Sequence, residues 1–370
     1  MRKLKVGIML TVALSMLLLA ACSTATPTPA PAQPTQAPAA QPTKAAEVTA
    51  APQATKAASK PFRVGLVTDI GKIDDRGFLQ MSWEGLLKAK QELGVEVQYI
   101  QTTDPKDYAK NIDQFATAGY DMIVTSGFGL VEATPAAAKK YPNIKFLAIG
   151  QAPADPLPPN LVALDFPEDQ GGFLAGVLAA MVSKANHIGA VWPTDAVPAV
   201  WRYGEGFRAG AKYVKPDIQI DVVYHNDVGF DKTFNDPEWG KTSALAMIDK
   251  GVDVIFSGAS DTTNGALLAC AQKGVLGIGA DSDAYLVLPE AKSILLSSAM
   301  KMITPDTFAI IKSAVDGTFK SAHVQGHVGL APFHDQEKSV TPEIKAKLDQ
   351  VLKGLQDGTL KTNVPPTKPS

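Results

Sequence analysis

Short polar or glycine-containing segments directly follow several apolar runs of the chain, and these segments are well suited to bind a ligand. They are Thr68-Asp69, Ser126-Gly127, Gly150-Gln151, Ser257-Gly258 and Asp281-Ser282-Asp283. Their carboxylates, hydroxyls and amides can form hydrogen bonds with a small polar molecule. If the apolar runs are parallel strands, these segments gather at the carboxyl edge of a sheet, where open α/β sheets bind ligands. The predicted chemistry is recognition of a small molecule.

The sequence carries no motif that would make such a site catalytic. It has no Gly-x-Gly-x-x-Gly after the first apolar run, no phosphate-binding loop and no Gly-x-Ser-x-Gly. His323, His327 and His334 lack a cysteine or Glu-x-x-His partner, so we interpret them as part of a solvated loop. Asp74-Asp75 lack calcium-loop spacing and are better explained as a turn with a charge at a helix start. We expect no enzyme activity, no cofactor and no metal.

Composition excludes further classes of protein. The chain has 370 residues, of which 45% are hydrophobic and 19% charged, and its formal net charge is −2. The length allows two domains, and the near-neutral charge argues against a nucleic-acid partner. The hydrophobic fraction is ordinary for a soluble protein. The two cysteines, Cys22 and Cys270, cannot form a disulfide framework, and we expect Cys270 to be buried.

The N-terminal segment is typical of a bacterial lipoprotein signal. Arg2, Lys3 and Lys5 make the start of the chain basic, residues 6–21 carry no charge, and Cys22 follows. The apolar stretch is shorter than the roughly 20 residues of a membrane-spanning helix. Residues 19–22 (LAAC) resemble a lipobox, which implies that Cys22 is acylated and anchors an extracytoplasmic protein to a membrane. A plain signal peptide with an accidental cysteine is the alternative.

Residues 23–61 consist largely of Ala, Pro, Thr, Gln and Ser, with few residues that could form a core. This composition predicts a disordered tether between the membrane anchor and a folded body.

From residue 62 onward, apolar runs of strand length alternate with segments of helical periodicity. The expected strands are 62–68, 95–100, 121–125, 144–149, 161–164, 187–191, 218–224, 252–256 and 275–280, and the expected helices are 77–93, 106–118, 130–140, 170–181, 200–213, 238–250, 263–272 and 304–316. Such alternation predicts an α/β protein with parallel sheets covered on both faces. Because the pattern restarts near residue 187, we expect two lobes with a ligand between them.

Several motifs resemble those of the basic membrane protein family, which comprises solute-binding lipoproteins and includes purine-nucleoside receptors of ABC transporters. The longest is LVTDIGKIDDRGFLQ at 66–80, followed by WEG at 83–85. Others are GYDMIV at 119–124, YPNIKF at 141–146, FLAGVLAA at 173–180, GFRAG at 206–210, FNDP at 234–237, GVDVIF at 251–256 and GADSD at 279–283. The resemblance covers about residues 62–335.

The resemblance implies a type I periplasmic-binding-protein fold, with two Rossmann-like lobes joined by a three-strand hinge. We expect lobe 1 to comprise residues 62–184 with about 301–318, and lobe 2 to comprise 185–300 with about 319–360. Residues 361–370 are expected to be a flexible tail.

The resemblance also implies that two phenylalanines sandwich a nucleobase, here Phe78 and Phe234. Core packing is the alternative role for each, and Phe230 and Trp239 compete with Phe234. Trp201 is a further candidate for stacking on a base.

By the same resemblance, Asp281 and Lys301 would hold a ribose, and Asp69 would contact the ligand. Gly127, in one of the segments at the strand ends, is a further candidate for ligand contact. Capping of a loop or helix is the alternative for the two aspartates, and Lys301 could be a surface lysine. Gln151 stands where the family usually has aspartate, and Gly77-Phe78-Leu79-Gln80 replaces Ser-Phe-Asn-Gln. Since glutamine can donate as well as accept, the recognised base edge can differ.

Together these patterns predict a lipid-anchored receptor that binds a purine nucleoside or related nucleobase and delivers it to an ABC permease and its ATPase. A sugar-binding or sensing lipoprotein of the same fold, or a surface lipoprotein that recognises host molecules, is the alternative.

Overall fold

The computed structural model describes residues 60–369, apart from the side chain of residue 231. The predicted signal peptide, Cys22 and nearly all of the predicted tether lie outside the described residues. Within residues 60–369, no helix is both long and apolar enough to span a membrane.

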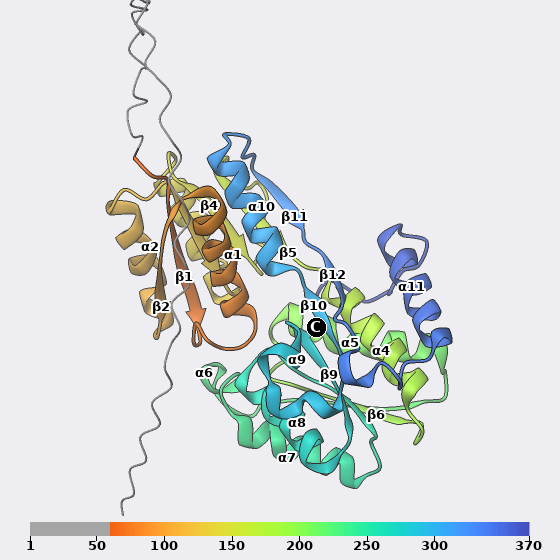
Figure 1. Ribbon diagram of the computed structural model, residues 1–370. Helices are drawn as coiled ribbons and strands as arrows, with labels where there is room; N and C mark the ends of the chain where they lie inside the picture. Colours follow the sequence, from red (N-terminus) through yellow and green to blue (C-terminus); the bar gives the residue numbers. More distant parts are fainter. Residues whose placement is uncertain (1–59, 370) are drawn as a thin grey trace, which may run out of the picture. The chain divides into compact units, whose positions relative to one another are not determined.

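The first lobe is built on a fully parallel six-stranded sheet with the order β11-β5-β4-β3-β1-β2. Its inner strands are apolar and buried on both faces, as expected when helices cover both sides. Helices α1 and α10 belong to the core on one face, and α2 and α3 to the core on the other. The elements are β1 (Arg63–Ile70), α1 (Phe78–Leu93), β2 (Glu96–Thr102), α2 (Tyr108–Thr117), β3 (Met122–Ser126), α3 (Ala133–Lys140), β4 (Lys145–Ile149), β5 (Leu161–Asp165), α10 (Ile303–Val315) and β11 (Ala322–Gln325) (Figure 1).

The second lobe repeats this plan with the order β12-β10-β9-β8-β6-β7, in which only the β10–β12 pair is antiparallel. Its longer elements are α4 (Glu168–Val182), β6 (His187–Trp192), α5 (Pro198–Val214), β7 (Gln219–Tyr224), α7 (Pro237–Asp249), β8 (Val254–Phe256), α8 (Asp261–Lys273), β9 (Leu276–Asp281), β10 (Leu295–Lys301), β12 (Val328–Leu330) and α11 (Pro342–Gln356). Short helices α6 (Phe230–Thr233) and α9 (Ala284–Val287) lie in loops, as do 3₁₀ turns η1 (Pro105–Asp107), η2 (Phe128–Leu130), η3 (Pro289–Ile294) and η4 (His334–Gln336).

The sheet orders define three places where the chain passes from one lobe to the other. These are the connections from β5 to α4, from β10 to α10 and from β11 to β12. Two α/β lobes with three crossings are the architecture of type I periplasmic binding proteins. The predicted fold class is confirmed.

The structure divides the lobes differently from the predicted ranges. Helix α4 was expected in lobe 1, but it packs on α5, α11 and the strands of the second sheet. Strand β11 was expected in lobe 2, but it pairs in parallel with β5 of the first sheet. The boundary therefore falls near residue 167 rather than 184, because α4 is apolar from Gly171 onward and this part of the helix needs packing partners on nearly every side.

The C-terminal segment also differs from the prediction of a flexible tail. The Thr362 hydroxyl donates to the Asp169 carboxylate, and Arg202 donates to the carbonyl of Pro366 over 3.1 Å. The Lys368 ammonium pairs with Asp195 at 2.7 Å. These contacts fasten residues 361–369 to the second lobe.

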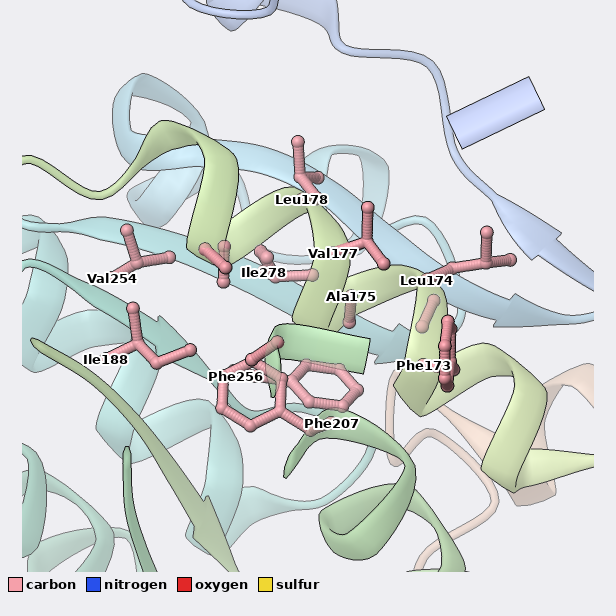
Figure 2. Packing of buried hydrophobic residues seen from close by; sticks show 14 of the residues in the cluster. Phe173, Leu174, Ala175, Val177, Leu178, Ile188, Phe207, Val254, Phe256 and Ile278 are labelled. Atoms are coloured by element: carbon pink, nitrogen blue, oxygen red, sulfur yellow. The ribbon is translucent and has the colours of Figure 1, made fainter. Parts of the chain in front are cut away.

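Helices α4 and α5 cross through glycines that bring their backbones into contact. A Cβ at Gly176 would lie 2.1 Å from the carbonyl oxygen of Phe207, and one at Gly210 would lie 2.0 Å from that of Phe173. Figure 2 shows the core beside this crossing, where the rings of Phe207 and Phe256 are 5.4 Å apart. The sequence motifs at 173–180 and 206–210 therefore encode the packing of one helix pair.

This crossing predicts that Gly210→Ala destabilises the protein although alanine is the better helix former. A methyl group cannot fit against a backbone carbonyl, so we expect the free energy of unfolding to fall by at least about 2 kcal/mol. Urea denaturation measures the change. Gly329→Ala is the matched control because its nearest neighbour would lie at an ordinary 3.6 Å. Equal stability of the two variants would contradict the packing described.

Candidate functional site

A pocket is lined by loops at the carboxyl ends of strands from both lobes. Six of the eight residues predicted to contact a ligand line it, namely Asp69, Phe78, Gly127, Phe234, Asp281 and Lys301. The lining also includes Lys72, Asp75, Phe128, Glu168, Trp192, Tyr203, Phe230, Asn235, Ser260 and Asp261. The polar segments identified at the strand ends thus converge on one site.

Asp69, at the end of β1, is a buried carboxylate held in a fixed orientation. Its Oδ2 accepts a hydrogen bond of 2.7 Å from the backbone N–H of Gly129, and its Oδ1 accepts one from the hydroxyl of Tyr108. Gly127 has a φ of 120° and approaches Asp69 so closely that a Cβ there would lie 2.2 Å from the Asp69 Cβ. A glycine is required here by both the backbone conformation and the space.

Phe78 is the first residue of α1, and the turn before it fixes its position. The Asp75 carboxylate accepts hydrogen bonds from the backbone N–H groups of Gly77, Leu79 and Gln80 at 2.8–3.1 Å. Asp75 thus satisfies the free N–H groups at the helix start. Burial raises the pKa of Asp75 to about 6, although these three hydrogen bonds favour the charged form.

Lys301, at the end of β10, lies in a buried cluster of charges. Its Nζ is 3.0 Å from Glu168 Oε1 and 3.3 Å from Asp281 Oδ1. It also lies 5.0 Å from the centre of the Phe78 ring. Glu168 in turn pairs with Arg202. Lys301 is only 4% exposed, so the alternative of a surface lysine is wrong.

The charges in this cluster are shifted by burial and by one another. Burial alone would lower the pKa of Lys301, but the charges of Asp281 and Glu168 outweigh it and the pKa is raised. Burial would likewise raise the pKa of Glu168, but Lys301 and Arg202 hold it below its usual value. For Asp281, burial prevails over Lys301 and the pKa is raised. The cluster therefore keeps Lys301 charged beside the pocket.

Aromatic side chains of the second lobe also line the pocket. Trp192 at the end of β6 stacks on Tyr203 of α5, with ring centres 5.6 Å apart and planes at 11°. The Tyr203 hydroxyl donates to Asp281 Oδ1 over 3.1 Å. Phe230 and Phe234 form an edge-to-face pair at 5.7 Å, and both line the pocket. Phe230 thus accompanies Phe234 in the lining.

Two residues predicted to contact a ligand do not line the pocket. Trp201 lies in the first turn of α5, and it is 7% exposed. The Gln151 side chain is buried, and its Nε2 donates to the carbonyl and hydroxyl oxygens of Thr125 at 3.1 and 3.0 Å. Both predictions are corrected, because the Trp201 ring is buried within the lobe and the Gln151 amide is hydrogen-bonded to Thr125. Trp239 stacks on His225 and is also outside the lining.

The three histidines have separate partners. His323 lies in β11 rather than in a loop and faces Asp155, whereas His327 faces Asp306 and His334 faces Asp283. Within residues 60–369, no cluster of three or more His, Cys, Asp or Glu side chains is arranged to hold a metal. Cys270 is buried, and burial raises its pKa to about 12.

Sequence reasoning missed several lining residues. Trp192 could have been found, because it ends the first strand of the second lobe just as Asp69 ends that of the first. Glu168 and Tyr203 gave no such signal, because they lie on helices that were not assigned to the site. Their role follows from the packing of α4 against α5 beside Lys301.

Two α/β lobes, three crossings and a pocket between opposed strand ends are typical of proteins that bind a small molecule between their lobes. Residues 62–328 match the family model described as ABC transporter substrate-binding protein PnrA-like. The chain belongs to this family of ABC transporter substrate-binding proteins, as the sequence resemblance predicted.

Several named proteins are similar to this chain over more than half of its length. A CD4+ T-cell-stimulating antigen of Listeria monocytogenes is 30% identical over 84% of this chain and 90% of its own. A nucleoside-binding protein of an ABC transporter of Lactococcus lactis is 33% identical over 55% of this chain and 57% of its own. A purine-binding protein of Brucella abortus is 29% identical over 79% and 82%. A solved ABC transporter solute-binding protein of Aeropyrum pernix superposes with a TM-score of 0.71 at 24% identity, covering 81% of this chain and 93% of its own.

The raised pKa of Asp75 predicts a pH dependence of stability. Since the folded state holds the Asp75 proton up to about pH 6, against a usual value of 3.8, stability should fall as the pH rises between these values. One unit of pKa difference corresponds to about 1.4 kcal/mol, so the free energy of unfolding should fall by about 3 kcal/mol in total. Asp75→Asn cannot titrate and should lack this component.

Urea denaturation of wild type, Asp75→Asn and the neighbouring control Asp74→Asn at pH 4, 5, 6 and 7 measures the effect. The stability difference between wild type and Asp75→Asn should change with pH, whereas the difference for Asp74→Asn should change less. A constant difference for Asp75→Asn would contradict the shifted ionisation.

Proposed function

We propose that the protein binds a purine nucleoside or related nucleobase in the interlobe pocket. The observation that carries the proposal is that Phe78 and Phe234, from opposite lobes, line one pocket with the Lys301–Asp281 pair. Aromatic rings suit the two flat faces of a base, and stacking contributes about 1–3 kcal/mol per base. The names of the Lactococcus and Brucella relatives support the same ligand class.

The buried charges suit the sugar of a nucleoside. Among the described residues, the polar contacts of the Asp281 carboxylate with Tyr203 and Lys301 use Oδ1. Oδ2 can therefore accept from a ribose hydroxyl, and a charged acceptor makes a strong hydrogen bond. Lys301 can donate to a sugar oxygen that lacks a hydrogen. A vicinal diol thus matches this part of the lining.

The Asp69 carboxylate is suited to accept a hydrogen bond from a ligand. Since Tyr108 and Gly129 hold its two oxygens in place, it presents a fixed acceptor at the edge of the first sheet. A purine carries N–H groups on its edge that can meet such an acceptor. Gln151 takes no part, because its side chain faces Thr125.

The anchoring and the partners follow from the family and the N-terminal sequence. Cys22 in the lipobox-like motif would carry the acyl chains, and residues 23–61 would link the anchor to the lobes. The bound solute would pass to the permease and ATPase of an ABC importer. Mass spectrometry of the membrane fraction tests whether Cys22 is acylated.

The ligand class is tested by thermal shift against a panel of nucleosides, nucleobases, sugars and amino acids. A ligand that binds only the folded state stabilises it by about 2.7 kcal/mol at a hundredfold excess over Kd. We expect shifts with purine nucleosides or purine bases. A shift with a sugar and none with any purine or pyrimidine would overturn the proposal.

The stacking role is tested by Phe78→Ala. Removing the ring should weaken purine binding roughly a hundredfold, as measured by calorimetry. Phe308→Ala is the matched control, because both phenylalanines are partly buried against the same core of the first lobe, and Phe308 does not line the pocket. Equal affinity of the two variants would remove Phe78 from the site.

A further inference from the structure

The loop between β1 and α1 touches the opposite lobe directly. The Ser282 hydroxyl donates to the carbonyl oxygen of Arg76 over 2.9 Å. The Lys72 ammonium lies 3.3 Å from Asp261 Oδ2. Residues 71–77 of the first lobe, here called the closing loop, thus contact the start of α8 and the loop after β9, and Arg76 also lies 3.8 Å from Glu290 of the second lobe.

At Gly77 the two lobes contact each other through backbone atoms alone. A Cβ on Gly77 would lie 2.9 Å from the carbonyl oxygen of Ala259, 3.1 Å from its Cα and 3.2 Å from its carbonyl carbon. All three are backbone atoms, so no side chain can rotate to make room. Any other residue at position 77 would hold the two loops further apart.

The opposing backbone is itself constrained. Ala259 has a φ of 78° and follows Gly258, whose φ is 151°. A non-glycine residue stays in this left-handed region only where the surrounding structure holds it there, so the position of the Ala259 backbone is fixed by its neighbours. A Cβ at Gly258 would meet the backbone nitrogen of Ala280 at 2.5 Å, which leaves this loop little freedom to retreat.

The contact also lies beside the ligand site. Gly77 directly precedes Phe78, and Ala259 lines the same pocket. Asp75 ties the closing loop to the start of α1 through the N–H groups of Gly77 and Leu79. Displacing the loop at Gly77 would therefore move the Phe78 ring as well.

We propose that Gly77 sets how far the two lobes close, and that its contact with Ala259 is the stop on which the closed state rests. A side chain at this position destabilises only the state in which the lobes touch. Because a ligand held by both lobes favours that state, the side chain lowers affinity without contacting the ligand.

Cross-linking tests closure without any ligand. A carbodiimide joins a lysine amine to a carboxylate within ion-pair distance, and the 72–261 pair reports contact between the lobes. Wild type should form this cross-link, and Gly77→Val should form it at least about fivefold less. The Lys140–Asp113 pair, 2.8 Å apart within the first lobe, is the internal control and should react equally in both.

Equal yields of the 72–261 cross-link in the two proteins would overturn the proposal, as would its absence from wild type. Unfolding temperatures of the unliganded proteins show whether Gly77→Val folds. Ser282→Ala adds no volume and removes one cross-lobe hydrogen bond, so it should lower the yield less.

The effect on affinity rests on the proposed function. If a purine binds wild type, Gly77→Val should bind it at least about tenfold more weakly, and an unchanged affinity would contradict the role of Gly77. If no purine binds but the cross-link still depends on position 77, the ligand class is wrong and the closure stop stands.

Discussion

The structure depends most on the buried charges around Lys301. Lys301 lies where β10 leads into the crossing to α10, and Glu168 begins α4 directly after the first crossing. Transferring such charges out of water is costly, and removing one partner leaves another unpaired. Arg202 of α5 completes the cluster by pairing with Glu168 and Asp165. The charges that face the pocket are therefore held by the same segments that join the lobes, so the site and the hinge cannot be varied independently.

The glycines at the crossing of α4 and α5 bring residues of this charged cluster together. Because Gly176 and Gly210 let α4 and α5 touch, Glu168 at the start of α4 comes within reach of Arg202 near the start of α5. A wider crossing would separate the two side chains and leave Glu168 buried without its second cation. The C-terminal segment extends the same arrangement, since the Pro366 carbonyl accepts from Arg202. The glycine packing between α4 and α5 therefore cannot change without also disturbing the Glu168–Arg202 pair.

Much of this arrangement could be predicted from the sequence, and the failures have physical causes. Most of the buried parallel strands have strong apolar runs, so they and the polar segments at their ends were predictable, but β10 was missed because two serines interrupt its apolar run. Strands β11 and β12 were also missed, because the pattern of β11 is mostly exposed and both are very short. Helix α4 was placed in the wrong lobe, because an apolar helix does not reveal which sheet it covers. Gln151 and Trp201 were misassigned because neither a family position nor a residue type shows where a side chain points.

The charges of the pocket limit what can bind. Asp69, Asp75, Glu168, Asp261 and Asp281 line it, against Lys72 and Lys301. Lys72 is paired with Asp261, and Lys301 with Glu168 and Asp281, so neither cation is left to balance an added anion. Asp281 is already harder to ionise because it is buried, and hydrogen bonds donated by a ligand would stabilise its charged form. A solute that brings hydroxyl and N–H donors, but no phosphate, therefore fits the electrostatics of the site, and the aromatic residues contributed by both lobes provide the surface for its flat part.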